Sequence, residues 1–380
     1  MQRIKIAARH DYQNKLEELS FTFHSLNSIY WDETAYWKFN PSEIDIVEKA
    51  TAELYRICLA AVQYVIDNKA YERLHIDPNL IPLIERSWEN DEPCVYGRFD
   101  LAFTNGDFTP KMLEFNADTP TSLYECAVVQ WYWMQDLFKE KDQFNSIHEQ
   151  LINYWTSCVE YFKGETIHFT CVRETIEDYT TVEYLRDTAQ QAGLKTKFLY
   201  IDEIGWDDNN KCFTDMESEE IKNIFKLYPY EWLIAEEFGS KIILDKNQSK
   251  WIEPAWKSIL SNKSILPLLW ELYPEHPNLL ECYDDSPRTM IDYVTKPVYS
   301  REGANVTIYD KCAVMVESGG DYGDEGLIFQ KRAELAESDN NFAIFGSWII
   351  GGEPAGMSVR ESNTMITDNL SRFVPHIISE

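Results

Sequence analysis

Three oxygen-bearing residues on two short alternating segments could together bind a metal ion. Asp100 lies on the polar face of the first segment, and Glu114 and Asn116 lie on the polar face of the second. Asn105 and Gly106 stand between the segments as a strong hairpin signal, which predicts antiparallel neighbours. Carboxylate and amide oxygens are hard ligands suited to Mg²⁺. The pattern therefore indicates a possible magnesium site on one face of a hairpin.

The same residues have a simpler interpretation. Arg98 shares the polar face with Asp100, and an arginine beside an aspartate on a solvated strand face is common. The register also matters, because Asp100 faces Glu114 only if the connecting loop is about five residues long. Taken alone, the hairpin favours an ordinary solvated surface over a metal site.

Two lysines and a glycine could bind phosphate groups. Residues 293–308 predict a strand carrying Lys296, a loop containing Gly303 and a returning strand, and backbone NH groups in such a loop can cover a triphosphate. An ordinary hairpin explains the same pattern. Lys263 lies further upstream, where a lysine could equally be a cation at a helix end.

Three other charged residues could contact substrates. Arg360 lies at the end of the second of two strands predicted around a tight turn, where it could neutralise a transferring phosphate or pair with a surface acid. Glu177 and Asp178 follow a predicted strand, at the end where open α/β sheets bind ligands. They could bind a cationic amine, or they could reflect the usual preference for acids at a helix start.

Periodicity predicts the elements that position these residues. An asparagine followed by a proline signals the start of an amphipathic helix from residue 41 to about 65. A second helix is expected over residues 120–138. Strands at 165–172 and 197–201 around a helix at 181–191 predict a βαβ unit. The unit contains too little glycine for a dinucleotide fingerprint, which disfavours a nicotinamide cofactor.

Composition narrows the possible partners. The 380 residues are enough for two or three lobes, and 64 acids against 35 bases give a net charge of -29. Such a charge repels nucleic acid and anionic lipid and attracts a cation such as a polyamine, although it also simply favours solubility. No membrane span or signal peptide is apparent, so a cytoplasmic location is expected. The eight scattered cysteines are expected to be structural thiols.

Several motifs together resemble the synthetase domain of the glutathionylspermidine synthase family, a group of ATP-grasp enzymes. The resemblance covers nearly the whole chain, and each motif is weak by itself. The motifs are RFD at 98–100, EFNADTPTSLYE at 114–125, SNKSILP at 261–267, TKPVYSREGANV at 295–306 and GSWIIGGEPAGMSVRES at 346–362.

The resemblance implies a role for each candidate residue. It implies two magnesium ions held by Asp100, Glu114 and Asn116, and nucleotide phosphates held by Lys263 and Lys296 under the loop around Gly303. Gln330 would lie near the adenine, and Arg98 and Arg360 would flank the acyl phosphate as it forms. Thr119, Thr121 and Ser122 would contact the acid, at a place where two-headed family members have small serine and cysteine residues. No hydrolase domain precedes the synthetase region, so no amidase activity is expected.

The resemblance implies a mixed α/β, ATP-grasp fold with a preATP-grasp-like βαβ lobe and a helical N-terminal part. Residues 1–380 are expected to form one synthetase module. Its approximate sub-regions are 1–160 with the hairpin, 161–250 as the βαβ lobe, 251–325 as a phosphate-covering lid and 326–380 as the strands that complete the cleft. The expected activity is ATP- and Mg²⁺-dependent ligation of a small acid to an amine. A phosphotransferase and a non-catalytic, acidic ATP-binding protein are the alternatives.

Overall fold

The computed structural model describes residues 1–380 except 26–27, 105–106, 238, 247 and 369–370. The mixed α/β fold is confirmed, with a mainly antiparallel sheet at its centre. The strand order in this sheet is β19-β18-β17-β3-β4, and β16 also pairs with β17. Its strands are β3 (Tyr96–Ala102), β4 (Lys111–Asn116), β16 (Ala336–Ser338), β17 (Asn341–Ile350), β18 (Glu353–Ser362) and β19 (Arg372–Val374).

A second sheet is parallel throughout and has the order β10-β9-β5-β6. Its first two strands along the chain are connected by helix α7 (Ile176–Gln191), so the predicted βαβ unit is confirmed. The strands are β5 (Ile167–Cys171), β6 (Thr196–Tyr200), β9 (Asn223–Leu227) and β10 (Lys250–Ile252).

A third sheet is antiparallel and has the order β11-β15-β12-β13-β14. Strands β12 and β13 pair on either side of the glycine-containing loop, which confirms the predicted strand-loop-strand arrangement. The strands are β11 (Cys282–Tyr283), β12 (Tyr293–Pro297), β13 (Thr307–Asp310), β14 (Ala313–Glu317) and β15 (Leu327–Lys331).

Two small sheets complete the strands. Strand β2 (Ala35–Phe39) pairs with β1 (Gln2–Lys5) and with β20 (His376–Ile378), so the two ends of the chain meet in one sheet. Strands β7 (Gly205–Asp207) and β8 (Cys212–Thr214) form a separate pair. The pairing of strands so far apart in the sequence cannot be predicted from local sequence patterns.

Helix α2 (Pro41–Asn68) begins where its capping signal predicts. The Asn40 side chain accepts a hydrogen bond from the Glu43 NH, and the Glu43 carboxylate accepts one from the Asn40 NH, which is a complete capping box. The remaining α-helices are α1 (Tyr12–Glu18), α3 (Ile81–Glu89), α4 (Gln130–Leu137), α5 (Ile147–Ser157), α6 (Val159–Phe162), α8 (Tyr230–Ala235), α9 (Gly239–Leu244) and α10 (Ile265–Leu272).

The helix predicted over residues 120–138 begins later than expected. A π-helical turn at Glu125–Val129 leads into α4, and residues 120–122 are not helical. Ser122 has φ +71°, a left-handed conformation that an α-helix cannot contain. The helix predicted from the apolar spacing is therefore confirmed from residue 123 onward, and the prediction is wrong for residues 120–122.

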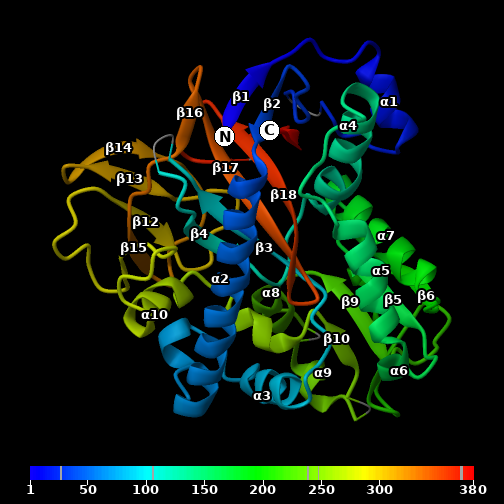
Figure 1. Cartoon of the computed structure of the whole chain (residues 1–380). Helices are drawn as coiled ribbons and strands as arrows, with labels where there is room; N and C mark the ends of the chain where they lie inside the picture. Colours follow the sequence, from blue (N-terminus) through cyan, green and yellow to red (C-terminus); the bar gives the residue numbers. More distant parts are fainter. Residues whose placement is uncertain (26–27, 105–106, 238, 247, 369–370) are drawn as a thin grey trace.

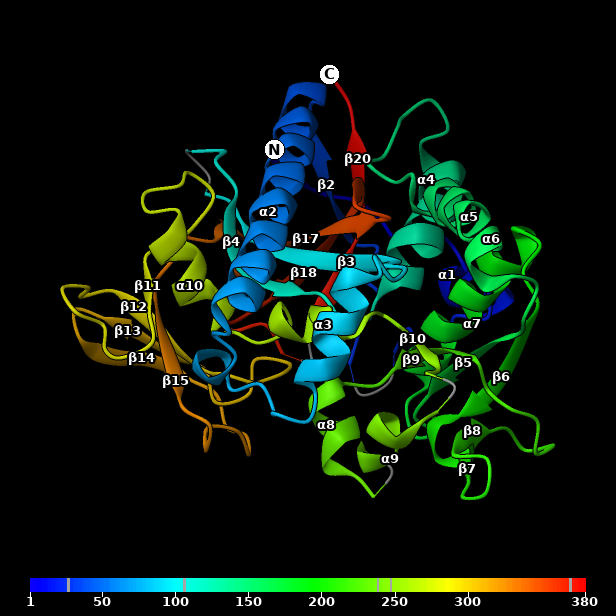
Figure 2. The same cartoon turned by 90° about the horizontal axis from the view of Figure 1, so that it is seen from below.

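The central sheet lies between two flanking parts. In both views the β12–β15 sheet lies on one side of β3, β17 and β18, and the lobe containing β5, β6 and α7 lies on the other, with α2 running along the centre (Figures 1 and 2). Helix α2 packs on β17 and β18. Among the described residues, no helix is long and apolar enough to cross a bilayer. The proposed boundaries of the four sub-regions stay a prediction.

Candidate active site

The predicted hairpin has the register that a shared site needs. Asp100 lies opposite Glu114 and Arg98 opposite Asn116 in the antiparallel pair of β3 and β4. Residues 103–110 connect the strands, a longer connection than the register argument required, and a bulge next to Asp100 adjusts the pairing. The Asn105-Gly106 turn itself lies outside the described residues.

The four side chains contact one another on one wall of a cavity of about 880 Å³. Arg98 Nε donates to Asp100 Oδ1 at 2.7 Å, and Asn116 Nδ2 donates to Asp100 Oδ2 at 3.2 Å. The same amide nitrogen lies 3.4 Å from Glu114 Oε1. The hairpin face is thus a cavity wall, and the interpretation as an open solvated surface does not describe it.

Lys263 and Lys296 both lie close enough to Glu114 to act on its charge. Lys263 Nζ is 3.0 Å from Glu114 Oε2, and Lys296 Nζ donates to the Leu113 carbonyl at 2.9 Å and to Gln330 Oε1 at 2.7 Å. Burial opposes ionisation of Glu114, but the two ammonium groups outweigh it and lower the pKa of Glu114 to about 2. Burial lowers the pKa of Lys296 to about 8, against the attraction of Glu114. Among the described residues, the two ammonium groups have one carboxylate between them within ion-pair distance, that of Glu114.

The loop between β12 and β13 covers part of the cavity. Gly303 has φ +70°, and a Cβ at this position would lie 2.4 Å from the Thr367 carbonyl oxygen, so only glycine fits here. Arg301 in the same loop donates to Thr119 Oγ1 at 3.0 Å and forms a 2.5 Å ion pair with Glu231. Arg301 lines the cavity, and the sequence prediction missed it although it stands two residues before the glycine.

The other predicted residues divide into two groups. Thr119, Thr121, Gln330 and Arg360 line the cavity. The predicted contacts Ser122, Glu177 and Asp178 do not line it. Ser122 Oγ donates to Glu177 Oε1 at 3.3 Å, and Glu177 and Asp178 stand in the first turn of α7.

The donor set of the hairpin fits a magnesium ion. Mg²⁺ typically takes one or two protein carboxylates and completes its coordination with phosphate oxygens and water. Asp100 and Glu114 supply two carboxylates on one cavity wall, and the amide of Asn116 can present its oxygen by rotation. Among the described residues, no three His, Cys, Asp or Glu side chains form a group that could hold a metal ion without other ligands.

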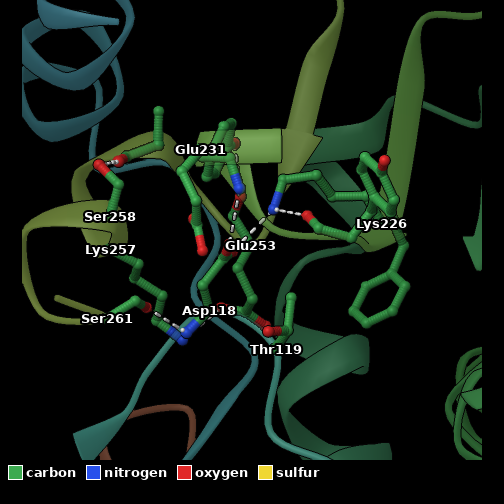
Figure 3. A network of polar contacts seen from close by, with 12 residues as sticks. Asp118, Thr119, Lys226, Glu231, Glu253, Lys257, Ser258 and Ser261 are labelled. Carbon is green, nitrogen blue, oxygen red and sulfur yellow. Dashed lines mark hydrogen bonds and ion pairs between the residues drawn. The ribbon is translucent and has the colours of Figure 1, made fainter. Parts of the chain in front are cut away.

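Two fully buried ion pairs, here called the support pairs, hold the two ends of the hairpin (Figure 3). Asp118 Oδ1 accepts from Lys226 Nζ at 2.7 Å, and Ser261 Oγ accepts from the Asp118 NH at 2.9 Å. Glu253 accepts from Lys257 Nζ at 2.5 Å and from the NH groups at the start of β3. The four charged side chains are at most 1% exposed. They tie both hairpin strands to the βαβ lobe.

The model of the family described as glutathionylspermidine synthase preATP-grasp matches residues 3–379. The chain belongs to this family. The predicted family is therefore confirmed, and with it the enzyme class, a ligase that forms C–N bonds.

Three relatives show how far the similarity extends. A protein of Haemophilus influenzae named as an acid–amine ligase is 38% identical over 97% of both chains. The trypanothione synthetase of Crithidia fasciculata is 30% identical over 83% of this chain, and the glutathionylspermidine synthase of the same organism is 26% identical over 86%. The chain spans only 52% and 56% of these last two proteins.

Proposed function

We propose that the chain is an ATP- and magnesium-dependent ligase that joins the carboxylate of a small acid to an amine through an acyl phosphate. The observation that carries this proposal is the cavity wall, where two carboxylates that suit Mg²⁺ lie beside two lysines that suit phosphate. Asp100, Glu114 and Asn116 would hold the metal, whose positive charge would stabilise phosphate oxygens.

The lysines and the covering loop would bind the nucleotide. Lys263 and Lys296 would replace their present partners with phosphate oxygens, and the loop around Gly303 would close over them. Gln330 already accepts a hydrogen bond from Lys296, and its own amide lies 3.3 Å from the Met112 carbonyl. It would lie at the adenine end of the site.

The arginines would position the acid. The acid carboxylate would attack the γ-phosphorus in line, forming a new P–O bond while the bond to the ADP oxygen breaks. Arg98 and Arg360 reach the cavity from β3 and β18, and Arg301 reaches it from the loop. Their fixed charges would neutralise the phosphoryl oxygens and orient both reactants. The deprotonated amine would then attack the acyl carbon and displace phosphate.

The relatives' names support a substrate class for this reaction. We propose glutathione or a similar peptide as the acid and a polyamine as the amine, with Thr119, Thr121 and Ser122 on the acid side. Glu177 and Asp178 would attract the amine. The net charge of -29 agrees with a cationic second substrate.

Oxygen-18 in the acid carboxylate tests the mechanism. Candidate acids are crossed with polyamines and amino acids, ADP release identifies a productive pair, and the released phosphate is then examined by mass spectrometry. Ligation through an acyl phosphate carries one labelled oxygen into the phosphate. Release of ADP without label in phosphate would instead indicate a phosphotransferase acting on a hydroxyl or amine.

A further inference from the structure

A buried carboxyl group that does not line the cavity has one of its two oxygens without a hydrogen-bond partner among the described residues. Glu125, in the π-helical turn before α4, is 1% exposed. Its Oε1 accepts a hydrogen bond from the Tyr30 hydroxyl at 2.5 Å. Its Oε2 is buried and has no hydrogen-bond partner among the described residues. A buried acceptor without a donor is costly, and such an atom calls for an explanation.

The charges around Glu125 come from several elements. Glu177 approaches it from α7, Arg360 from β18, and Tyr30 from the segment before β2. Burial and then the negative charge of Glu177 raise the pKa of Glu125 to about 8, against the opposing effects of the Tyr30 hydroxyl, the backbone NH of Glu125 itself and Arg360. The pKa of Tyr30 is itself well above 10 because of burial and these carboxylates, so its hydroxyl remains a donor.

Two acids at the start of α7 are more exposed than Glu125. Glu177 and Asp178 are both intermediate in burial, whereas Glu125 is enclosed. Burial, Glu177 and Glu302 raise the pKa of Asp178 to about 7. An incoming cation would therefore meet Glu177 and Asp178 first and Glu125 last. An ammonium group only donates hydrogen bonds, so it can pair with Oε2 once the Glu125 carboxyl has lost its proton.

We propose that Glu125 is the buried counter-ion for an ammonium group of the amine substrate, and that its carboxyl group releases a proton when the amine binds. This inference rests on the proposed function, because it assigns a residue to the amine. In the step, the O–H bond of the Glu125 carboxyl breaks and the proton leaves to solvent. The ammonium keeps its own protons and donates one hydrogen bond to the new carboxylate.

The sign of the pH dependence follows from this exchange. The free protein holds a proton on Glu125 below pH 8 that the complex does not hold. Binding of the amine therefore becomes tighter as pH rises toward 8, by up to about tenfold per pH unit, and levels off above it. Asp178 contributes a similar dependence nearer pH 7, so variants are needed to separate the two acids.

Calorimetry with spermidine as the probe tests the proposal. The full chain is titrated at pH 7 in buffers of different ionisation enthalpy, with and without a non-hydrolysable Mg-ATP analogue, which gives the number of protons released. We expect wild type to release protons and Glu125→Gln to release about one fewer. The variant should also bind about tenfold more weakly at pH 8 and lose most of its pH dependence below 8.

Two further variants keep the test decisive. Glu174→Gln removes one negative charge at an exposed position near α7 and should leave the proton count unchanged. Tyr30→Phe removes the donor to Glu125, so it should shift the pH dependence to higher pH while proton release persists; this readout serves if Glu125→Gln does not fold.

The inference would be overturned if Glu125→Gln released as many protons as the wild type. It would also be overturned if the wild-type protein did not bind spermidine either with or without the Mg-ATP analogue. Failure of the proposed function looks different. In that case spermidine binds with Glu125-dependent proton release, yet no acid produces ADP.

Discussion

The support pairs and the cavity lysines are both buried charges that hold the same hairpin, but they are satisfied in different ways. Asp118 with Lys226, and Glu253 with Lys257, are pairs of one acid and one base with no access to the cavity. Lys263 pairs with Glu114, Lys296 donates to Gln330 and to the Leu113 carbonyl, and both lysines line the cavity beside a Glu114 side chain that is 29% exposed. Charges of the first kind can only support the structure, whereas charges of the second kind can exchange a protein partner for a phosphate.

The largest expected effect comes from breaking a support pair. Asp118→Asn leaves the fully buried Lys226 without its carboxylate, which should lower the free energy of unfolding by about 3–5 kcal/mol. Burial already lowers the pKa of Lys226, so proton loss would limit the cost to this range. Urea denaturation followed by circular dichroism measures it. Asp118→Asn with Lys226→Met should recover most of the stability, and a single variant as stable as wild type would show that the pair is not structural.

A cavity lysine should show the opposite pattern. Lys296→Met should reduce ADP release by about 10²–10³-fold, because a preorganised charge on the phosphoryl group is lost. Its free energy of unfolding should change little or rise, since a desolvated cation is removed. Lys311→Met, on an exposed turn of the same sheet, is the matched control and should alter neither quantity. Equal losses of stability in the Lys296 and Asp118 variants would remove the distinction between the two sets.

The pH dependence of nucleotide binding sharpens the comparison further. Lys296 loses its charge as pH rises through about 8, so affinity for Mg-ATP should fall about fivefold between pH 8 and 9. Calorimetry should show this fall in wild type and a flat profile in Lys296→Met. The pKa of Lys296 in the folded protein lies below 10.5, the ordinary value for lysine. The unfolded chain therefore binds more protons between these two values, and the contribution of Lys296 to stability increases with pH there.

The smallest expected effect concerns the covering loop. Gly303→Ala places a methyl group against the Thr367 carbonyl in a left-handed conformation, which should cost about 1–2 kcal/mol locally and raise the KM for ATP several-fold. Gly319→Ala is the control, because a Cβ there meets no atom within 4 Å. Steady-state kinetics and thermal melting distinguish them. Identical behaviour of both variants would mean that the loop does not need glycine at 303.

Local patterns were sufficient for the parts of the fold whose partners are close in sequence. The alternation in β3 and β4 predicted which side chains share a face, and the capping signal at Asn40 predicted the start of α2. The βαβ unit followed from period and turn signals. The pairing of β3 with β17 did not, because those strands lie about 250 residues apart and no local signal names a partner.

The candidate site was predictable where residue type and motif coincided. The family motifs implied that Lys263, Lys296 and Glu114 belong to one nucleotide site, and in the structure both lysines lie near the Glu114 carboxylate. Arg301 was missed because an arginine in a loop has many ordinary roles, and its cavity position depends on Thr119 and Glu231 from distant segments. The burial of Glu125 and Asp118 could not be predicted from the sequence either, because packing between distant elements decides whether an acid is buried.

The place of β17 in the central sheet has a consequence for synthesis of the protein. Strand β3, which carries Arg98 and Asp100, receives its second neighbour only from residues 341–350. During translation the hairpin must therefore wait for more than two hundred further residues before its outer edge is covered. Competence to bind nucleotide should accordingly appear only after residue 350 has been synthesised, and a ribosome-bound chain arrested before residue 341 should present β3 as an open edge that chaperones can recognise.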